Sequence, residues 1–264
     1  QTEVEARDTA GIQADFLNAA AVAERFSLRR TGAILSDISA SANPAQMAAG
    51  LLRATKTRGV EVVSPLEITD IRSTTQGVFL ATAEGRILSA GAAVFCSGYE
   101  FLEALADKDH AIVSTWALAT PPATTLPAWL RDCIVWEGSD PYLYLRRSRD
   151  GRLIAGGEDE DSEDAFASPQ KLKAKAKTIR RKVEALLGMP LPEPDYSWAA
   201  PFGTTRTGLP LIGRVPGLGN VFAVMGFGGN GITFSQIAAE IVSADIAGHS
   251  DADADLFAFR TRGP

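Results

Sequence analysis

The sequence predicts a mixed α/β (α+β) fold in which parallel and antiparallel strands belong to different layers. Near the C-terminus, an apolar run at 221–225 meets a glycine cluster and then an amphipathic pattern, which predicts a strand, a tight loop and a helix. Residues 111–157 carry β-prone runs broken by prolines, which indicates an antiparallel layer. With 264 residues, the chain can form one large or two modest domains.

In the first hundred residues, helices come before strands. Residues 1–30 are rich in Ala, Glu and Arg and are expected to form helical segments. Asn43-Pro44 supplies an N-cap and a proline at the first helical position, which predicts a helix ending near Gly59. Residues 60–63 are then expected to form a strand.

A meander and one buried strand follow. Three short β-type runs, 67–71, 78–82 and 86–90, are separated by turn signals and predict a three-stranded meander. Residues 92–96 are continuously apolar and end in Ser97-Gly98, as expected of a fully buried parallel strand that meets a ligand at its carboxyl end. Cys96 is therefore expected to be a buried, inert thiol.

The second half of the chain alternates between a hairpin and helices. Tyr142, Tyr144 and Arg146 alternate with leucines, so we expect polar aromatic tips on one sheet face. Residues 158–164 hold six acids in seven positions and predict a solvated loop, without the glycine and spacing of a calcium site. Ser168-Pro169 then opens a basic helix, expected to be solvated or paired with those acids.

The glycine cluster at 226–231 is the strongest functional signal. Glycine lacks a Cβ, so these residues allow positive φ and a close approach of backbone to a bound group. The helix start behind them offers free N–H donors and a partial positive charge, which suit an electron-rich ligand. A plain structural turn explains the same glycines about equally well, and the surrounding pattern favours part of a cofactor site.

Composition excludes several classes of function. The net charge of −6 and the lack of a clustered basic pattern argue against nucleic acid as a partner. No membrane-span or signal-peptide pattern is found, so we expect a soluble, cytoplasmic protein. Two cysteines and two histidines lie outside any ligand spacing, so no metal site is expected. A Ser-His-Asp arrangement is also missing, which disfavours hydrolysis.

Three motifs together resemble the FAD-dependent oxidoreductases of the glycine oxidase and D-amino acid oxidase (DAO) superfamily. They are 209–213 (Leu-Pro-Leu-Ile-Gly), 227–233 (Phe-Gly-Gly-Asn-Gly-Ile-Thr) and the strand ending at Ser97-Gly98. The resemblance runs from about Asn43 to Gly248. Three further segments recur with these motifs in bacterial members: 98–100, 156–160 and 198–208. The order and spacing of all these motifs are more specific than any single motif.

This resemblance implies a partial FAD/NAD(P)-binding Rossmann-like domain interleaved with an antiparallel-sheet substrate domain, with the flavin between them. Residues 1–102 and 205–264 would form the FAD-binding domain and 103–204 the substrate domain, with packing of residues 1–40 against the substrate domain as the alternative for that segment. The positions matching the family's flavin contacts are Leu66, Ser97, Gly98, Gly228, Gly229, Asn230, Gly231, Ile232 and Thr233.

The sequence departs from the family pattern at its start. Family members open with a strand, a G-x-G-x-x-G turn and a helix that hold the pyrophosphate, whereas this chain begins at Gln1 in a helical pattern. We therefore expect a truncated form with poor FAD affinity, in which the cofactor could be absent. The alternative is a non-catalytic fragment or subunit whose partner supplies the nucleotide-binding half; exposed sheet edges would then drive association with that partner or with itself.

A second departure concerns the substrate. Phe202 occupies the position where amino acid oxidases of this superfamily usually place an arginine for the substrate carboxylate. An amine or N-substituted amino compound is therefore favoured over a simple amino acid, although Arg146, Arg147 or Arg206 could supply the charge. Tyr142 and Tyr144 are candidates for the substrate face, and a structural sheet role is equally open for each.

The resemblance implies oxidation of a C–N bond to an imine, with oxygen or another electron acceptor completing the cycle. No residue is assigned as a catalytic base, because such oxidations can proceed from a neutral amine. A nicotinamide-dependent enzyme is a weaker reading, since the glycine loop lies near the C-terminus.

Overall fold

The computed structural model describes residues 2–100 and 102–259, which form two compact units. The first unit comprises residues up to 43, 115–160 and 165–200, and the second comprises 44–114, 161–164 and 201 onward. The chain passes between the units several times. This confirms the predicted mixed fold with antiparallel sheets, while the assignment of cofactor and substrate domains stays a prediction.

A five-stranded sheet forms the centre of the first unit, in the order β11-β7-β10-β9-β8. Strands β8, β9 and β10 pair antiparallel, as predicted for this layer. The bounds are β7 (His110–Ala119), β8 (Val135–Trp136), β9 (Leu143–Arg147), β10 (Leu153–Glu160) and β11 (Tyr196–Thr205).

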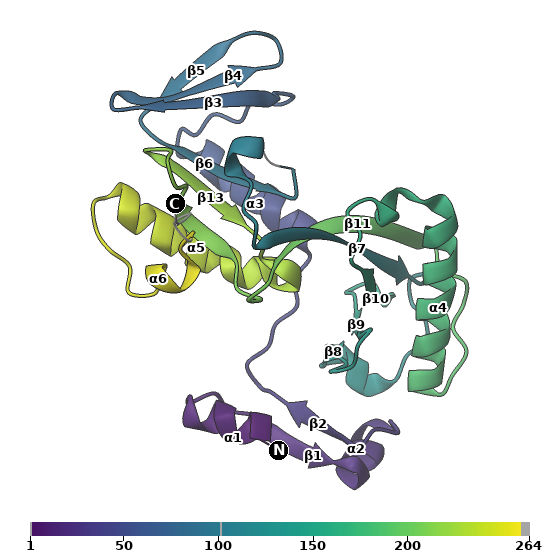
Figure 1. Ribbon diagram of the computed structural model, residues 1–264. Coiled ribbons are helices and arrows are strands. Elements are labelled where there is room, and N and C mark those ends of the chain that lie inside the picture. Colours follow the sequence, from purple (N-terminus) through teal and green to yellow (C-terminus); the bar gives the residue numbers. More distant parts are fainter. Residues whose placement is uncertain (1, 101, 260–264) are drawn as a thin grey trace. The chain divides into compact units, whose positions relative to one another are not determined.

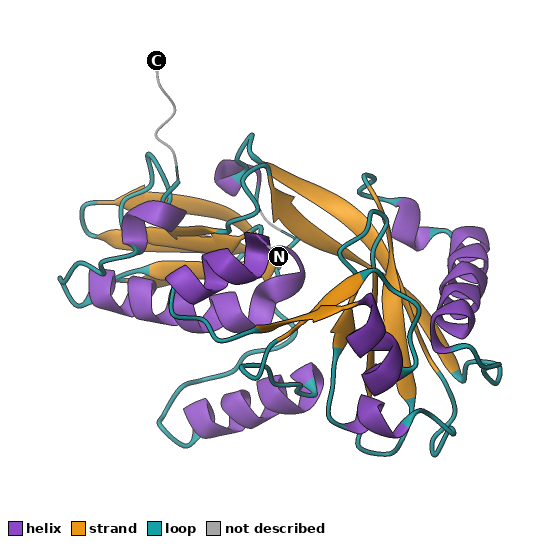
Figure 2. Cartoon of the chain, turned by 90° about the horizontal axis from the view of Figure 1, so that it is seen from below, coloured by secondary structure: helices purple, strands orange, loops and turns teal. Residues whose placement is uncertain are grey.

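Helix α4 (Pro169–Leu187) packs against this sheet (Figure 1; Figure 2 gives a second view). Ser168 caps it by accepting a hydrogen bond from the Lys171 backbone N–H at 3.2 Å, and Gly188 ends it with a φ of +65°. The predicted helix is confirmed, and its buried side chains recur every three to four residues: Ala176, Ile179, Val183 and Leu186. The last three join the sheet leucines in one core.

The N-terminal segment differs from the helical prediction for residues 1–30. It contains α1 (Thr2–Thr9) and α2 (Ala19–Phe26), but also β1 (Asp15–Asn18) and β2 (Gly32–Leu35). Strands β1 and β2 pair antiparallel, with Phe16 opposite Ile34. That pairing joins residues 18 positions apart, so local composition could not reveal it. Val22 of α2 joins the core of the first unit.

Within its described residues, the second unit holds two three-stranded sheets and three α-helices. The meander is confirmed as β3 (Ile68–Thr74), β4 (Gly77–Thr82) and β5 (Ile87–Ala90). The other sheet has the order β12-β13-β6, with β13 antiparallel to β12 and parallel to β6. Its bounds and those of the helices are β6 (Ala93–Gly98), β12 (Leu211–Arg214), β13 (Val221–Met225), α3 (Pro44–Lys56), α5 (Gly231–Ile246) and α6 (Ala254–Phe257).

Strand β6 is parallel, as predicted, but the prediction that it is fully buried is wrong. It is the edge strand of its sheet, and Val94 and Cys96 are exposed. The prediction that Cys96 is buried is wrong for the same reason. An apolar run indicates burial only when neighbouring strands and helices cover it, and the run itself does not supply them.

Residues 60–63 do not form the predicted strand. They are irregular chain without sheet pairing, and Val63 is 64% exposed. Helix α3 forms where predicted, yet none of its residues is buried. A strand pattern becomes a strand only when another strand pairs with it, and no described strand does so here. None of the described helices is long and apolar enough to span a bilayer.

Candidate functional site

One end of the β12-β13-β6 sheet brings together two segments that the sequence singled out. In the parallel pairing of β13 with β6, Met225 lies opposite Gly98. The chain leaves β13 after Met225 and enters the glycine loop, while β6 ends at Ser97 and Gly98. The loop and the end of β6 therefore meet at the carboxyl edge of the parallel strands, where α/β sheets bind ligands.

Glycine is required at the first position of this loop. Gly226 has a φ of +71°, and a Cβ there would lie 2.5 Å from Thr205 Cγ2 and 3.2 Å from His110 Cδ2. Gly228 also has positive φ, but around it and around Gly229 the space where a Cβ would sit is open. The loop therefore packs tightly where it leaves the sheet and presents open backbone further on.

The loop ends in the first turn of α5. A short 3-10 helix, η4 (Gly228–Asn230), leads into α5, and Asn230 makes no side-chain capping bond to the N–H groups of that turn. The Phe227 ring lies 4.0 Å from the Cβ position of Gly98 and 3.0 Å from that of Gly231. The Phe227 ring therefore contacts both the end of β6 and the start of α5. The N–H groups of the first turn of α5 have no side-chain cap, so they and the partial positive charge of the helix end can interact with a ligand.

Sequence analysis missed the spacing of these glycines. Gly226, Gly228 and Gly231 match the pattern G-x-G-x-x-G, which follows a strand and opens a helix here. The dinucleotide-binding unit continues from its helix into a second parallel strand. Between α5 and Phe259 the described chain forms the short α6 and no further strand. The spacing by itself therefore does not assign a dinucleotide site to this loop.

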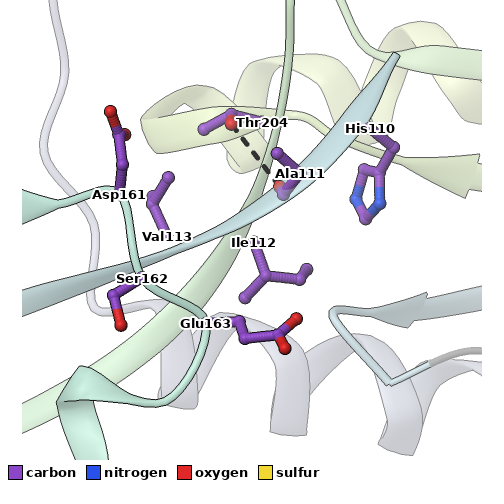
Figure 3. Close-up of a pocket in the computed structure, with 8 residues that line it drawn as sticks. All are labelled: His110, Ala111, Ile112, Val113, Asp161, Ser162, Glu163 and Thr204. Carbon is purple, nitrogen blue, oxygen red and sulfur yellow. Dashed lines mark hydrogen bonds between the residues drawn. The ribbon is translucent and has the colours of Figure 1, made fainter. Parts of the chain in front are cut away.

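A cavity of about 400 Å³ lies beside the loop within the second unit (Figure 3). The start of β7, the 161–163 segment and Thr204 of β11 line it; Figure 3 labels all of these residues. The Thr204 hydroxyl donates to the Ala111 carbonyl at 3.4 Å, across the two strands. Two acids, Asp161 and Glu163, are among the residues that line this cavity.

His110 connects this cavity to the glycine loop. A Cβ at Gly203 would lie 2.4 Å from His110 Nε2, so the imidazole fits against two glycines, Gly203 and Gly226. Burial lowers the pKa of His110, and the charge of Asp107 partly offsets that effect. Sequence analysis considered His110 only as a metal ligand, because the glycines that receive its ring lie more than ninety positions away.

The first unit gathers polar aromatic residues on one face of β8, β9 and β10. Leu143 and Leu145 belong to the core against α4, so Tyr142, Tyr144 and Arg146 occupy the opposite face. Trp136 lies opposite Tyr144 in the β8–β9 pairing. We call the surface made by Trp136, Tyr142, Tyr144 and Asp159 the tyrosine face.

Hydrogen bonding and burial keep the tyrosines of this face protonated. The Tyr142 hydroxyl donates to Asp159 Oδ2 at 2.7 Å. Burial raises the pKa of Tyr142 well above its usual range, and the bond to Asp159 and the Asp159 charge add to this. Burial also raises the pKa of Tyr144, with Asp159 adding and Arg146 opposing. The prediction of a solvated loop over 158–164 is wrong for residues 158–160, which belong to β10, so Asp159 was missed.

Of the remaining predicted site residues, Leu66 and Phe202 belong to neither group. Leu66 is half-buried in irregular chain just before β3, and Phe202 is half-buried in the part of β11 that belongs to the second unit. Ile232 and Thr233 are exposed in the first turn of α5. The flavin and substrate roles of all these residues stay predictions.

Comparison with known proteins identifies the family. The family model described as FAD dependent oxidoreductase, DAO, matches residues 1–244. The chain belongs to this family. A search of the curated proteins found no significant match. FAD is therefore the cofactor of the family to which this chain belongs, and the predicted resemblance is confirmed.

Solved structures of this superfamily share the fold of the chain. Glycine oxidase from Geobacillus kaustophilus aligns with a TM-score of 0.78 at 20% identity, over 97% of this chain and 70% of that one. L-Proline dehydrogenase from P. horikoshii gives 0.78 at 17% identity, over 97% and 70%. Iminodiacetate oxidase from Chelativorans sp. gives 0.74 at 16%, over 100% and 71%. At these identities the likeness concerns the fold alone.

The loop geometry fits one end of FAD. Gly228 and Gly229 leave open space where side chains would stand, the α5 start has no side-chain cap, and the Gly98 end of β6 lies at the same sheet edge. Such backbone donors suit the electron-rich pyrimidine edge of a flavin. Within this DAO-family chain, Ser97, Gly98 and residues 228–233 are the residues that would hold it.

Proposed function

We propose that this protein is an FAD-dependent oxidoreductase that oxidises a C–N bond of an amine or amino acid. The observation that carries the proposal is the meeting of the Gly98 end of β6 with the uncapped start of α5, in a chain of the DAO family. A bound flavin supplies the chemistry by accepting a hydride from the carbon next to nitrogen. Oxygen is the simplest electron acceptor for the return step.

The chain's own residues have binding and orienting roles in this proposal. The N–H groups of the first turn of α5 donate to the electron-rich edge of the cofactor, with the partial positive charge of the helix end behind them. Open backbone at Gly228 and Gly229 allows close approach. Tyr142, Tyr144, Arg146 and Phe202 are the proposed substrate contacts, with no residue assigned as a base.

The test is an FAD titration of the purified chain followed by visible absorption. We expect the flavin spectrum to shift on binding and to bleach when a suitable amine is added without oxygen. Gly226→Ala should weaken binding because its Cβ would displace the loop, whereas Gly217→Ala, also at positive φ but in open space, should not. An unshifted spectrum at saturating FAD would refute cofactor binding by this chain.

A second candidate is a non-catalytic subunit or fragment whose partner supplies the nucleotide-binding half. Exposed apolar residues within the second unit favour it: Leu51, Leu52, Val60, Val62, Val63 and Val94. They lie on α3, on the unpaired 60–63 segment and on the edge strand β6, as if a further strand and helix were to cover them. In that case FAD would bind only after a polypeptide with a strand, a G-x-G-x-x-G turn and a helix is added.

A further inference from the structure

His110 lies where three segments of the second unit meet. It begins β7, Gly203 lies near the end of β11, and Gly226 is the first residue of the glycine loop. A Cβ at Gly203 would lie 2.4 Å from His110 Nε2, and a Cβ at Gly226 would lie 3.2 Å from His110 Cδ2. The imidazole therefore occupies the space left by two missing side chains, and it lies against β11 and the loop at once.

Hydrogen bonds fix the start of β7 to the end of β11. The Asp109 backbone N–H donates to Asp107 Oδ1 at 2.8 Å, and the His110 backbone N–H donates to the Asp107 carbonyl at 3.1 Å. The Arg206 backbone N–H donates to the Asp109 carbonyl at 3.1 Å, and its Nε pairs with Asp109 Oδ1 at 3.3 Å. The backbone that carries the His110 ring is thus held firmly beside β11.

The glycine loop meets this junction through packing. Its first residue, Gly226, has a φ of +71° and leaves no room for a Cβ beside Thr205. Within the loop, the Asn230 N–H donates to the Phe227 carbonyl at 3.2 Å, a bond that does not connect the loop to β7 or β11. The fit of Gly226 against Thr205 and His110 therefore determines how the loop lies on the sheet end.

The two segments that enclose the ring cannot stabilise a positive charge on it. Residues 203–205 and 226–231 contain no ionisable side chain. Burial lowers the pKa of His110, and the charge of Asp107 only partly offsets this effect. The neutral imidazole is therefore the form that is stable between Gly203 and Gly226.

Acidic residues lie elsewhere around the ring. Asp161 and Glu163 line the same cavity as His110, and Figure 3 shows the Glu163 and His110 side chains on the same side of β7. Asp109 is already paired with Arg206. An imidazolium that moves away from the two glycines would be solvated and would lie closer to unpaired acids than to the loop. Protonation of the ring therefore favours its separation from the loop.

We propose that His110 is a positioning residue for the glycine loop: the neutral imidazole holds the loop against β11, and protonation of the ring releases it. The fraction of released loop should rise as the pH falls below the ordinary histidine pKa of about 6.5, because the held loop favours the neutral ring. This loop would hold the cofactor, so the consequence for FAD rests on the proposed function. FAD that binds the held loop would bind less tightly in acid.

The first test is a proton NMR titration of the imidazole signals of the purified 264-residue chain, without FAD. The chain has two histidines, and His110→Gln assigns their signals. The titration midpoint of His110 should lie below about 6.5. Gly203→Ala should raise this midpoint, because the new Cβ displaces the ring. Gly91→Ala, with open space at its Cβ position, should leave it unchanged.

The second test follows the loop itself. Deuterium uptake of peptides covering 221–236, corrected for the intrinsic pH dependence of amide exchange, should increase between pH 7.5 and pH 5. The expected increase is about tenfold for each unit by which the pKa of His110 is lower in the held loop than in the released one. The same peptides from His110→Gln should show no increase. Peptides from α4 should show none in either protein.

Two results would overturn the proposal. One is an equal response of the loop to pH in the parent protein and in His110→Gln. The other is a His110 midpoint that Gly203→Ala leaves unchanged. If Gly203→Ala does not fold, the exchange comparison between the parent and His110→Gln decides alone.

Adding FAD separates the role of His110 from the proposed function. Bound FAD should slow exchange at 226–233. If the loop responds to His110 but FAD does not slow its exchange, the positioning role stands and the cofactor site fails. If FAD slows the exchange but His110→Gln keeps the pH response of the parent, the cofactor site stands and the positioning role fails.

Discussion

Gly226→Ala should destabilise the protein by more than its backbone conformation alone explains. At a φ of +71°, an alanine costs about 1–2 kcal/mol relative to an unstrained position. Its Cβ would also lie 2.5 Å from Thr205 Cγ2, which is about 1–1.5 Å closer than the roughly 3.5–4.0 Å of a normal carbon contact. Overpacking of this kind costs about 1–3 kcal/mol. The expected loss is about 2–5 kcal/mol in the free energy of unfolding.

Gly217→Ala is the matched control. Gly217 has a φ of +80°, with nothing within 4 Å of its Cβ position, so only the backbone cost of about 1–2 kcal/mol applies. The loss of unfolded-state entropy is the same for both changes and cancels in the comparison. Urea unfolding followed by far-UV circular dichroism should therefore give a difference of about 1–3 kcal/mol between the two variants.

A second substitution identifies the crowded atom. Thr205→Ser removes Cγ2 but keeps the hydroxyl that donates to the Leu209 carbonyl at 2.6 Å. Combined with Gly226→Ala, it should recover part of the lost stability, which a double-mutant cycle would report as a favourable coupling. Equal destabilisation by Gly226→Ala and Gly217→Ala, or a double variant without coupling, would refute the steric argument.

Two further predictions concern charged groups. Burial lowers the pKa of His110, so the neutral imidazole contributes stability above the ordinary histidine pKa of about 6.5, and this contribution is lost as the pH falls below that value. Between pH 7.5 and pH 5 the midpoint of urea unfolding should therefore fall more steeply for the parent protein than for His110→Gln. Parallel curves for the two proteins would contradict this. Lys175→Met removes the donor to the Glu158 carbonyl and the 3.1 Å ion pair with Glu160, and should lower the free energy of unfolding in urea by about 1–3 kcal/mol. Lys173 is exposed, so Lys173→Met should change that free energy little. Similar losses for both variants would count against an anchoring role for Lys175.

The sequence by itself determined the local elements whose signals are complete within a few residues. The cap at Ser168 and the apolar spacing of 172–186 define α4, because a helix forms its hydrogen bonds within its own segment. The glycine run after 221–225 defines the loop before α5, because only glycine tolerates the crowding and positive φ found at Gly226. The family resemblance depended on the same local motifs.

Tertiary structure decided what lies beside those elements. The 60–63 run has the composition of a strand, yet no described strand pairs with it. The 92–96 run has the composition of a buried strand, yet it forms the exposed edge strand of its sheet. Pairing and burial both depend on neighbours that are distant in sequence. The same holds for the candidate sites. His110 reaches Gly226, and Asp159 reaches Tyr142, only through the packing of separate strands and, for Asp159, a reversal of alternation at Gly157–Glu158. Periodicity along the chain cannot anticipate contacts that only the assembled sheets create.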